Sequence, residues 1–399
     1  MDTKELMAWS DKHLMATAKR HPVALVRGDG ARVWDSDGKE YLDFTGGIAV
    51  TALGHSHPKV VGTMREQAAT LLHVSNIFYI PQQVHLAKLL CEHSFADRVF
   101  FSNSGAEANE TAIKLARRWA KEHGASDRGD IISMRGGFHG RTLATVTATA
   151  QEKYHHGFEP LPGGFKYVPF NDLRAVERAI DSRTAAVLVE PIQGEGGVNI
   201  PDDGYLPGLR KLCDEAGILL IFDEIQTGMG RTGRLWCYEH AGVTPDIMTL
   251  AKALANGVPI GATLATENVA QVFTPGTHGS TFGGNPFATA VGLTVFSTLV
   301  EERLSERADR LGRRLHDRLR AVQSRRPGAV TAVRGRGLLV GMDLVPAVAG
   351  VVSACRERGL LVLTAGDNTL RLAPPLIVDE LAVDRATDII EQALGDHAA

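Results

Sequence analysis

The stretch GILLIFDEIQTG, residues 217–228, decides what kind of fold this sequence can form. Its five consecutive apolar residues, Ile218 to Phe222, predict a strand buried on both faces, because a parallel sheet covered by helices gives a continuous hydrophobic run. Asp223 and Glu224 follow directly. A carboxylate at the end of such a strand is costly to desolvate unless something positive meets it. The stretch therefore predicts a partner for the carboxylate.

Short β-rich runs alternate with helical stretches from about residue 98 onward, and this alternation predicts α/β layering. The β-rich runs are RVFFS (98–102), DIISM (130–134), AAVLV (185–189), ILLIF (218–222) and DIMTL (246–250). Functional residues of open α/β sheets collect at the carboxyl ends of strands, and each of these runs is followed by glycine-rich or polar residues. We therefore expect one crevice built from several loops.

A chain of 399 residues suits a large domain with a smaller companion. At about residue 300 the pattern changes to a charged helical stretch followed by short strands. We expect three parts: an N-terminal segment 1–45 that packs with the small domain, a large domain 46–299, and a small α+β domain 300–399.

Composition excludes several classes of protein. Charged residues make up 22% of the chain and the net charge is -3, so no basic surface for nucleic acid is expected. The first 15 residues are too charged for a secretory signal, and no apolar run approaches the ~20 residues of a membrane span. These features predict a cytoplasmic protein with neither a nucleic-acid nor a membrane partner.

A metal site is not expected either. The four cysteines, Cys91, Cys213, Cys237 and Cys355, have no C-x-x-C spacing, which favours reduced thiols. The pair of histidines in GHSHP, residues 54–58, lacks a carboxylate or cysteine at a matching spacing, so a structural turn is the better interpretation.

Two glycine-containing stretches are candidates for binding phosphate. SGAE, residues 104–107, fits a capping box at the start of a helix, and a helix N-terminus at a strand end is also an anion site. A plain helix cap is the alternative. GMGRTG, residues 228–233, matches G-x-G-x-x-G but does not sit directly at the strand end, so we interpret it as a loop.

Lys252 follows the strand DIMTL closely and lies between apolar neighbours. On its own it could be a solvated loop lysine. However, Asp223 and Lys252 stand at the ends of two successive strands, so both can reach one crevice. A desolvated lysine readily forms a Schiff base. An acid for a ring nitrogen, this lysine and a helix N-terminus for phosphate together meet the needs of pyridoxal 5'-phosphate.

Over nearly its whole length the sequence resembles the class III (ω-amino acid) aminotransferases, most closely acetylornithine aminotransferases. The resemblance rests on these motifs: VWDSDGKEYLDFTGGIAVTALGHSHP, FFSNSGAEANETAIKLAR, GGFHGRT, EPIQGEGGV, IFDEIQTGMGRTG, LAKALANGVPIGA, HGSTFGGNP, RGRGLLVG and LRLAPPL. It implies the type I pyridoxal-phosphate transferase fold, with a large domain around a mostly parallel sheet and a small α+β domain.

The resemblance also implies roles in cofactor binding. Asp223 would meet the protonated pyridine nitrogen and keep the ring an electron sink. Gln226 would bind the ring hydroxyl oxygen, while Ile225 and Phe138 would lie against the two ring faces. Lys252 would form the Schiff base and move the proton during catalysis.

The phosphate contacts imply a homodimer. Gly105 and Ala106 would hold the phosphate through backbone N–H groups, and Thr281 would reach it from the neighbouring subunit. The active site would then lie at the subunit interface.

The substrates implied are small amino and 2-oxo acids, bound by two arginines. Arg141, with Ser280 of the neighbouring subunit, would hold the carboxylate of the ω-amino substrate. Arg371 would hold the α-carboxylate of glutamate, because a planar guanidinium matches a carboxylate in a bidentate manner. Glu195 would pair with Arg371 when glutamate is absent; a solvated loop acid is the alternative.

The implied reaction is transamination of N2-acetylornithine with 2-oxoglutarate, giving N-acetylglutamate 5-semialdehyde and glutamate in arginine biosynthesis. The resemblance implies that enzymes preferring free ornithine carry tyrosine at the position of Ile48. Isoleucine cannot hydrogen-bond the free α-ammonium of ornithine, so Ile48 favours the acylated donor. A simple core role for Ile48 is the alternative.

Other functions stay open. Aminotransferases of ornithine, succinyldiaminopimelate, 4-aminobutyrate or carrier-bound aminoadipate semialdehyde, and aminomutases, share the cofactor residues. A regulator that has lost catalysis and a nicotinamide dehydrogenase are the rivals from other classes.

Overall fold

The computed structural model of the protein describes residues 3–124, 127–345 and 347–395. Its centre is a seven-stranded sheet with the strand order β4-β10-β9-β8-β7-β5-β6. The strands are β4 Arg98–Ser102, β5 Asp130–Met134, β6 Phe165–Val168, β7 Thr184–Val189, β8 Leu219–Asp223, β9 Ile247–Leu250 and β10 Gly261–Ala265. All run in one direction except β10, which is antiparallel to β4 and β9.

Five of these strands, β4, β5, β7, β8 and β9, correspond to the five predicted runs. The sequence patterns do not predict β6 and β10. In β10 the sequence GATLA consists mainly of small residues with weak β propensity, yet all five residues are buried because the strand lies between two neighbours.

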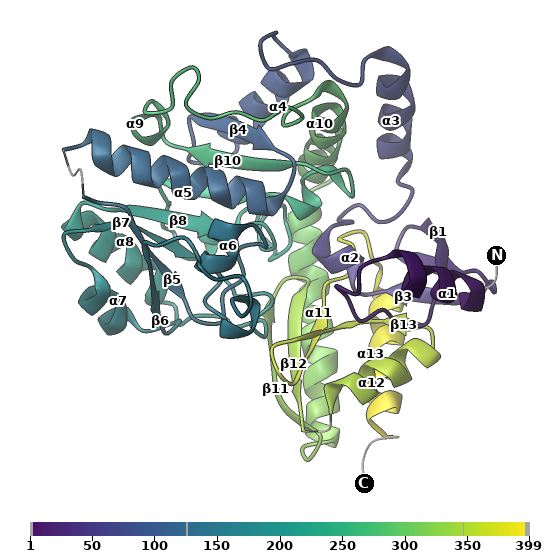
Figure 1. The fold of residues 1–399 in the computed structure, drawn as a ribbon. Helices are drawn as coiled ribbons and strands as arrows, with labels where there is room; N and C mark the ends of the chain where they lie inside the picture. Colours follow the sequence, from purple (N-terminus) through teal and green to yellow (C-terminus); the bar gives the residue numbers. More distant parts are fainter. Residues whose placement is uncertain (1–2, 125–126, 346, 396–399) are drawn as a thin grey trace.

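Helices cover both faces of the central sheet (Figure 1). On β8, Leu219 and Ile221 pack with α5, while Leu220 and Phe222 belong to the core that α8 joins. Both faces of this strand are therefore buried, as its continuous apolar run predicts. The helices of this part are α3 Pro58–Thr70, α4 Pro81–Glu92, α5 Gly105–Glu122, α6 Leu143–Ala148, α7 Leu173–Ala179, α8 Tyr205–Ala216, α9 Glu267–Ala270 and α10 Pro286–Glu301.

The two chain ends meet in a second part of the molecule, where the N-terminal and C-terminal segments lie side by side (Figure 1). One sheet has the order β1-β2-β3-β13, in which β3 pairs in parallel with β13. The other, β11-β12-β15-β14, is antiparallel. The strands are β1 Leu25–Asp29, β2 Arg32–Asp35, β3 Glu40–Asp43, β11 Val330–Arg336, β12 Leu339–Leu344, β13 Leu360–Leu361, β14 Leu363–Ala365 and β15 Thr369–Leu372.

Long helices pack on these small sheets. Arg314 of α11 donates to both carboxylate oxygens of Asp384 on α13, at 2.9 and 2.6 Å. The helices of this part are α1 Thr3–His13, α11 Leu304–Arg325, α12 Val348–Glu357 and α13 Glu380–Gly395, and the short helix α2 Gly46–Ala49 lies at the boundary with the large part. The pairing of β3 with β13 places the N-terminal segment and the C-terminal part in one sheet, while the division at residues 46 and 300 stays a proposal. Residues 1–2 and 396–399 lie outside the described residues.

Candidate active site

A cavity of about 420 Å³ opens at the carboxyl ends of β8 and β9. Most of the residues predicted for the cofactor and substrate line it. They are Gly105, Ala106, Phe138, Arg141, Glu195, Asp223, Ile225, Gln226 and Lys252. Because these residues come from separate loops at the carboxyl ends of the strands, the cavity is the crevice that the sequence pattern predicts.

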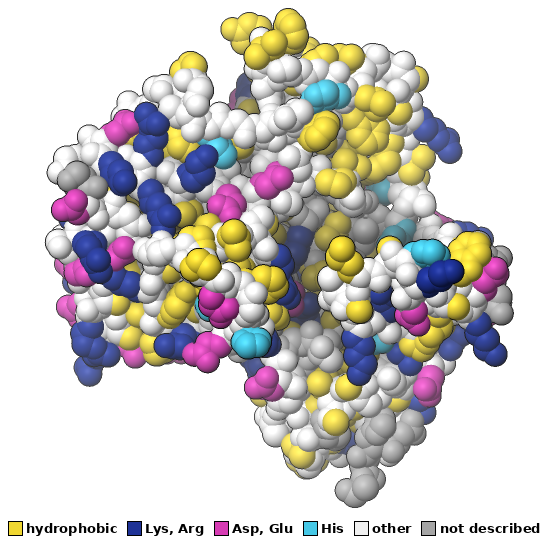
Figure 2. All heavy atoms as spheres, in the orientation of Figure 1, with side chains coloured by type: hydrophobic (Ala, Val, Ile, Leu, Met, Phe, Trp, Pro, Cys, Tyr) yellow, Lys and Arg dark blue, Asp and Glu magenta, His cyan; other side chains and the backbone are white. Residues whose placement is uncertain are grey.

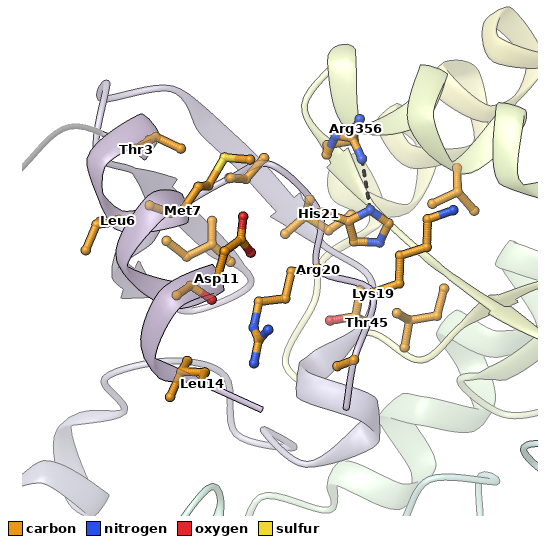
Figure 3. A pocket seen from close by; sticks show the side chains of 18 of the residues that line it. Thr3, Leu6, Met7, Asp11, Leu14, Lys19, Arg20, His21, Thr45 and Arg356 are labelled. Carbon is orange, nitrogen blue, oxygen red and sulfur yellow. Dashed lines mark hydrogen bonds between the residues drawn. The ribbon is translucent and has the colours of Figure 1, made fainter. Parts of the chain in front are cut away.

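A larger cavity, of about 790 Å³, lies between α1 and the C-terminal segment around Leu361 (Figure 3). None of the predicted site residues lines it. Its charged groups include Arg356, whose Nη1 contacts Nδ1 of His21 at 2.9 Å. The chemistry predicted from the sequence is therefore concentrated in the smaller cavity.

Asp223 ends β8 with only 3% of its surface exposed. Its Oδ2 accepts hydrogen bonds from Nδ2 of Asn109 and is 2.8 Å from Nδ1 of His139, and its Oδ1 accepts from the backbone N–H of Ile225. Burial alone would lower the pKa of His139, but Asp223 and then Glu190 outweigh burial and raise that pKa. The partner predicted for this buried carboxylate thus includes a histidine of the same chain.

His139 and Asn109 are functional candidates that sequence reasoning missed. His139 lies in the motif GGFHGR between Phe138 and Arg141, two expected site residues, so its position in that motif could have indicated a role in the site. Asn109 gave a weaker signal, as one of two polar residues, with Thr111, on the buried face of α5.

Lys252 follows β9 and faces the same cavity. It adopts a left-handed backbone conformation with φ 34°, which is rare for a non-glycine residue and concentrates at functional sites. Burial lowers the pKa of its amine; Glu195 opposes that shift and Arg371 adds to it. A larger fraction of this lysine is therefore neutral than of a solvated one.

The N-terminus of α5 opens toward the cavity at Gly105 and Ala106. A Cβ on Gly105 would come within 2.8 Å of the Ile225 side chain, so this close packing requires glycine. The predicted capping box forms only in part: Ser104 accepts from the backbone N–H of Glu107, but the Glu107 carboxylate accepts from Asn103. The carboxylate reaches one residue further back because Asn103 offers it two donors, its backbone N–H and its side-chain amide.

Arg371 and Glu195 form a contact of 2.5 Å beside the cavity. Arg371 is 3% exposed and also donates to Oε1 of Gln226 at 3.3 Å. Burial would raise the pKa of Glu195, but Arg371 and Lys252 outweigh it and hold that pKa below its ordinary value. Glu195 is therefore a paired carboxylate in this chain, in contrast to the solvated loop acid considered as the alternative.

Arg141 lines the cavity next to two aromatic side chains. Its guanidinium carbon is 4.0 Å from the ring centre of Tyr154 and 5.6 Å from that of Phe138. These cation–π contacts orient the exposed guanidinium, and Tyr154 is a further residue that the sequence did not point to.

Four predicted residues do not line this cavity in the single chain: Arg371, which lies beside it, and Ile48, Ser280 and Thr281. Ser280 and Thr281 lie in the loop before α10, where Thr281 is exposed. Ile48 is 47% exposed, with φ 68°, so within one chain it is not a core residue. The two loop residues were predicted to act on a neighbouring subunit, and that prediction stays open.

Comparison with known proteins identifies the class of protein. The family model for aminotransferase class-III matches residues 14–394. An acetylornithine aminotransferase of Myxococcus xanthus is 52% identical over 96% of each chain, and one of Methanothermobacter thermautotrophicus is 47% identical over 99% of this chain and 100% of its own. The chain therefore belongs to the class-III aminotransferases, which confirms the resemblance found in the sequence.

Solved structures agree with this family. An ornithine aminotransferase from Toxoplasma gondii, described with partial occupancy of PLP at its active site, superposes with a TM-score of 0.96 at 37% identity, covering 99% of this chain and 95% of its own. An acetylornithine aminotransferase from Elizabethkingia anophelis gives a TM-score of 0.89 at 36% identity, over 99% and 100%. The predicted fold class is thereby confirmed.

Family membership also carries coarser chemical statements. Class-III aminotransferases are pyridoxal-phosphate enzymes, and their substrates are small amino and 2-oxo acids. Among the described residues, no helix is both long enough and apolar enough to cross a membrane.

Proposed function

We propose that this protein transfers the ω-amino group of N2-acetylornithine to 2-oxoglutarate with pyridoxal 5'-phosphate as cofactor. The products are N-acetylglutamate 5-semialdehyde and glutamate. The observation that carries the proposal is that Lys252 and Asp223, at the ends of adjacent parallel strands, line one cavity with the N-terminus of α5. The names of relatives that are 47–52% identical over nearly the whole chain support the donor.

The residues present fit this cofactor. The N-terminus of α5 offers unpaired backbone N–H groups to a phosphate, and the absence of a side chain at Gly105 leaves them accessible. Ile225 and Phe138 both line the cavity and supply apolar surfaces for the two faces of a ring. Asp223 is held by three hydrogen-bond partners and lines the cavity, so its carboxylate is available to a protonated ring nitrogen. When bound, the cofactor supplies an electron sink.

Lys252 is proposed as the base and acid of the reaction. Its lowered pKa makes the neutral amine more available, and a neutral Nζ can take the proton from the carbon that bears the transferred amino group. Acting as the acid, the lysine would then deliver that proton to the cofactor carbon that receives the amino group.

Arg371 and Glu195 are proposed as a switch for the two substrates. While Glu195 occupies the guanidinium, Arg371 is not free to bind a carboxylate. A 2-oxo acid or glutamate with an α-carboxylate would displace Glu195 and take its place in bidentate contact. Arg141, at the exposed side of the cavity, is proposed to bind the carboxylate of the ω-amino donor. Arg371 is therefore not needed for this donor.

A homodimer is proposed because the single chain leaves a large apolar surface uncovered. Exposed apolar side chains gather around α3 and α4 (Figure 2). They include Leu71, Leu72, Ile77, Phe78 and Tyr79, with Phe282 of the loop before α10. Extended exposed patches of this kind mark protein interfaces. Ser280 and Thr281 adjoin Phe282, so they would enter the partner's site from this interface.

Free ornithine is the second candidate donor, because the Toxoplasma gondii ornithine aminotransferase has nearly the same backbone. A panel of amino donors with 2-oxoglutarate as acceptor separates these candidates and the other ω-amines. We expect N2-acetylornithine to exceed ornithine in kcat/KM by about tenfold or more, which is ~1.4 kcal/mol of discrimination. Equal use of both would remove the donor assignment and leave the cofactor assignment in place.

A further inference from the structure

The loop formed by residues 278–284 carries Ser280 and Thr281 and leads into α10. The structure describes the loop in full, and it contains neither helix nor strand. At its tip Thr281 and Phe282 are exposed, and neither lines the cavity of its own chain. A loop without regular structure needs side-chain anchors if its tip is to have one fixed position.

His278 is the first of these anchors. Its Nδ1 is 2.8 Å from Nζ of Lys114, and its Nε2 is 3.0 Å from Oγ1 of Thr111, so both ring nitrogens contact α5. The rings of Phe100 and Phe273 lie against the imidazole, with centroids 4.7 and 5.4 Å away. Four side chains from three segments therefore hold this histidine.

The hydrogen-bond partners assign one tautomer to His278. The Lys114 ammonium can only donate, so Nδ1 must accept and the ring proton lies on Nε2. The Nε2–H group then donates to Thr111, whose hydroxyl donates to the backbone carbonyl of Glu107. This chain of hydrogen bonds leads from the loop to the first turn of α5, the proposed phosphate-binding end.

The surroundings favour the neutral form of His278. Burial and then the charge of Lys114 lower the pKa of the imidazole, while Glu110 opposes them. Both charged groups belong to α5, and the other packed groups, Phe100 and Phe273, are uncharged. A neutral ring can accept from Lys114, so the electrostatics agree with the assigned tautomer.

Asn103 is the second anchor and leads to the same turn of α5. Its Nδ2 donates to Oγ of Ser280 at 3.2 Å and to the Glu107 carboxylate at 2.8 Å. Asn103 also lines the cofactor cavity of its own chain. Asn76 supports the loop from the opposite side by donating to the carbonyls of Ser280 and Gly283.

We propose that His278 is a positioning residue that fixes the loop 278–284 to α5 of its own chain and thereby sets cofactor affinity in the neighbouring subunit. The proposal rests on the dimeric site described under the proposed function. In the assembled dimer, each α5 would bind one phosphate at its N-terminus and brace, through His278 and Asn103, the loop that completes the other site.

The first measurement is the dissociation constant of pyridoxal phosphate for the cofactor-free dimer. His278→Ala should raise it about tenfold, since two hydrogen bonds and a packed ring are lost. His278→Gln keeps one acceptor and one donor and should recover most of the affinity. His123→Ala is the matched control, because His123 also stacks on a ring of α5 and bonds to its backbone but lies at the far end of that helix. No change in His278→Ala would overturn the proposal.

Mixed dimers then decide which subunit the loop serves. A His278→Ala chain is paired with a Lys252→Ala chain, so that lysine-attached cofactor absorbance reports only the site whose loop comes from the intact partner. That site should bind like wild type. In the reverse pairing, wild type with the double variant His278→Ala/Lys252→Ala, the site with the lysine receives the altered loop and should show the tenfold loss.

The two pairings also separate this inference from the proposed function. If the first pairing shows the loss and the reverse pairing binds like wild type, His278 acts on the α5 of its own chain's site and the proposal is overturned. If wild type is a monomer or does not bind pyridoxal phosphate, the proposed function itself fails. If the wild-type dimer binds the cofactor and Thr281→Ala weakens it while His278→Ala does not, only the role of His278 is refuted.

Discussion

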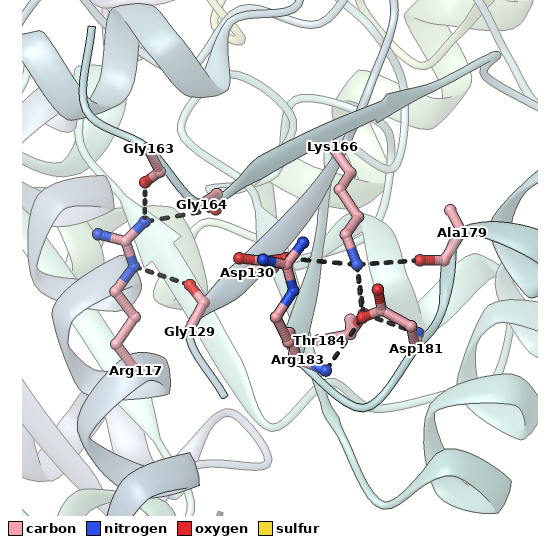
Figure 4. Close-up of polar contacts among 10 residues, drawn as sticks. All are labelled: Arg117, Gly129, Asp130, Gly163, Gly164, Lys166, Ala179, Asp181, Arg183 and Thr184. Atoms are coloured by element: carbon pink, nitrogen blue, oxygen red, sulfur yellow. Dashed lines mark hydrogen bonds and ion pairs between the residues drawn. The ribbon is translucent and has the colours of Figure 1, made fainter. Parts of the chain in front are cut away.

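The two ends of the central sheet both carry charged residues, but their surroundings differ. At the amino ends of β5, β6 and β7, Nζ of Lys166 lies 2.6 Å from Asp181 and 3.4 Å from Asp130, and Arg183 also contacts Asp130 (Figure 4). At the carboxyl ends, Lys252 has no ion pair within the part of the chain that the structure describes. The lysine at the amino ends is paired with carboxylates, whereas the lysine at the carboxyl ends has no such pair.

This difference separates structural charges from functional ones. The Lys166 ammonium donates to Asp181, Thr184 and the carbonyl of Ala179. These three acceptors match its three N–H groups, so it is poorly placed to bind a ligand. Asp223 is held by donors that fix its position, and Lys252 faces an open cavity. A buried lysine without an ion pair is costly in its charged form, so such a group is expected where a ligand will supply the partner.

The largest expected effect comes from Lys252→Ala. Without the amine there is neither covalent attachment of the cofactor nor a base for proton transfer, so kcat should fall by at least about 10⁴-fold. Turnover is measured together with the absorbance of lysine-attached pyridoxal phosphate. Lys166→Ala, at the other end of the sheet, is the control and should retain both. Attachment that survives in Lys252→Ala and is trapped by borohydride would assign the Schiff base to another lysine.

Asp223→Ala should be nearly as damaging, with kcat reduced about a thousandfold, because the ring nitrogen loses the carboxylate that keeps it protonated. The cofactor can still bind through the other contacts, which a titration would reveal. Glu224→Gln is the neighbouring control. Glu224 accepts from the backbone N–H groups of Cys237 and Tyr238 and faces away from the chemistry, so the folded variant should keep its kcat. Full activity in Asp223→Ala would remove the electron-sink role.

The two arginines should separate by half-reaction. Arg371→Ala should reduce kcat/KM for glutamate and 2-oxoglutarate about a hundredfold, and Arg141→Ala should do the same for the ω-amino donor, since each loses a bidentate contact. Single-turnover kinetics of each half-reaction make the comparison. Equal damage to both half-reactions from either variant would contradict the assignment.

Sequence reasoning reached the cavity because its residues follow recognisable strands. Asp223 and Lys252 were placed by the strand ends alone, since parallel neighbours bring their carboxyl ends together. Gln226, Phe138 and the arginines needed the family resemblance, because nothing in their spacing reports which loops face one another.

What the sequence could not predict depends on long-range contacts. His139 meets Asp223 across 84 positions of the chain, and only the packing of α5 brings Asn109 to the same oxygen. The strand β10 also went unpredicted, since its small residues become a strand through their neighbours. Ser280 and Thr281 lie outside the cavity of their own chain, so their proposed roles can be tested only in the dimer.

Substitution of Ile48 tests which amino donor the enzyme prefers. Ile48→Tyr should narrow the preference for N2-acetylornithine over ornithine by about tenfold, because a phenol can hydrogen-bond the free ammonium that isoleucine leaves unpaired. The measurement is kcat/KM for both donors. Ile48→Val, which adds no polar group, should leave the ratio unchanged. An unchanged ratio in the tyrosine variant would remove Ile48 from the substrate site.

The smallest effect is expected at the structural end of the sheet. Asp181→Asn should lower the free energy of unfolding by about 1 kcal/mol near neutral pH, because the pair with Lys166 is partly exposed and screened. The Lys166 ammonium lowers the pKa of Asp181 to about 2 from the ordinary 3.8, so this stabilisation is present above about pH 4 and is lost as the pH falls toward 2. Urea unfolding at pH 7 and pH 3 should therefore show the difference between variant and wild type shrinking at the lower pH. Asp203→Asn, which removes a fully exposed partner of Arg336, is the control and should change neither value. A difference that is the same at both pH values, or a loss of turnover in folded Asp181→Asn, would mean that the two ends of the sheet are not as separate as their contacts indicate.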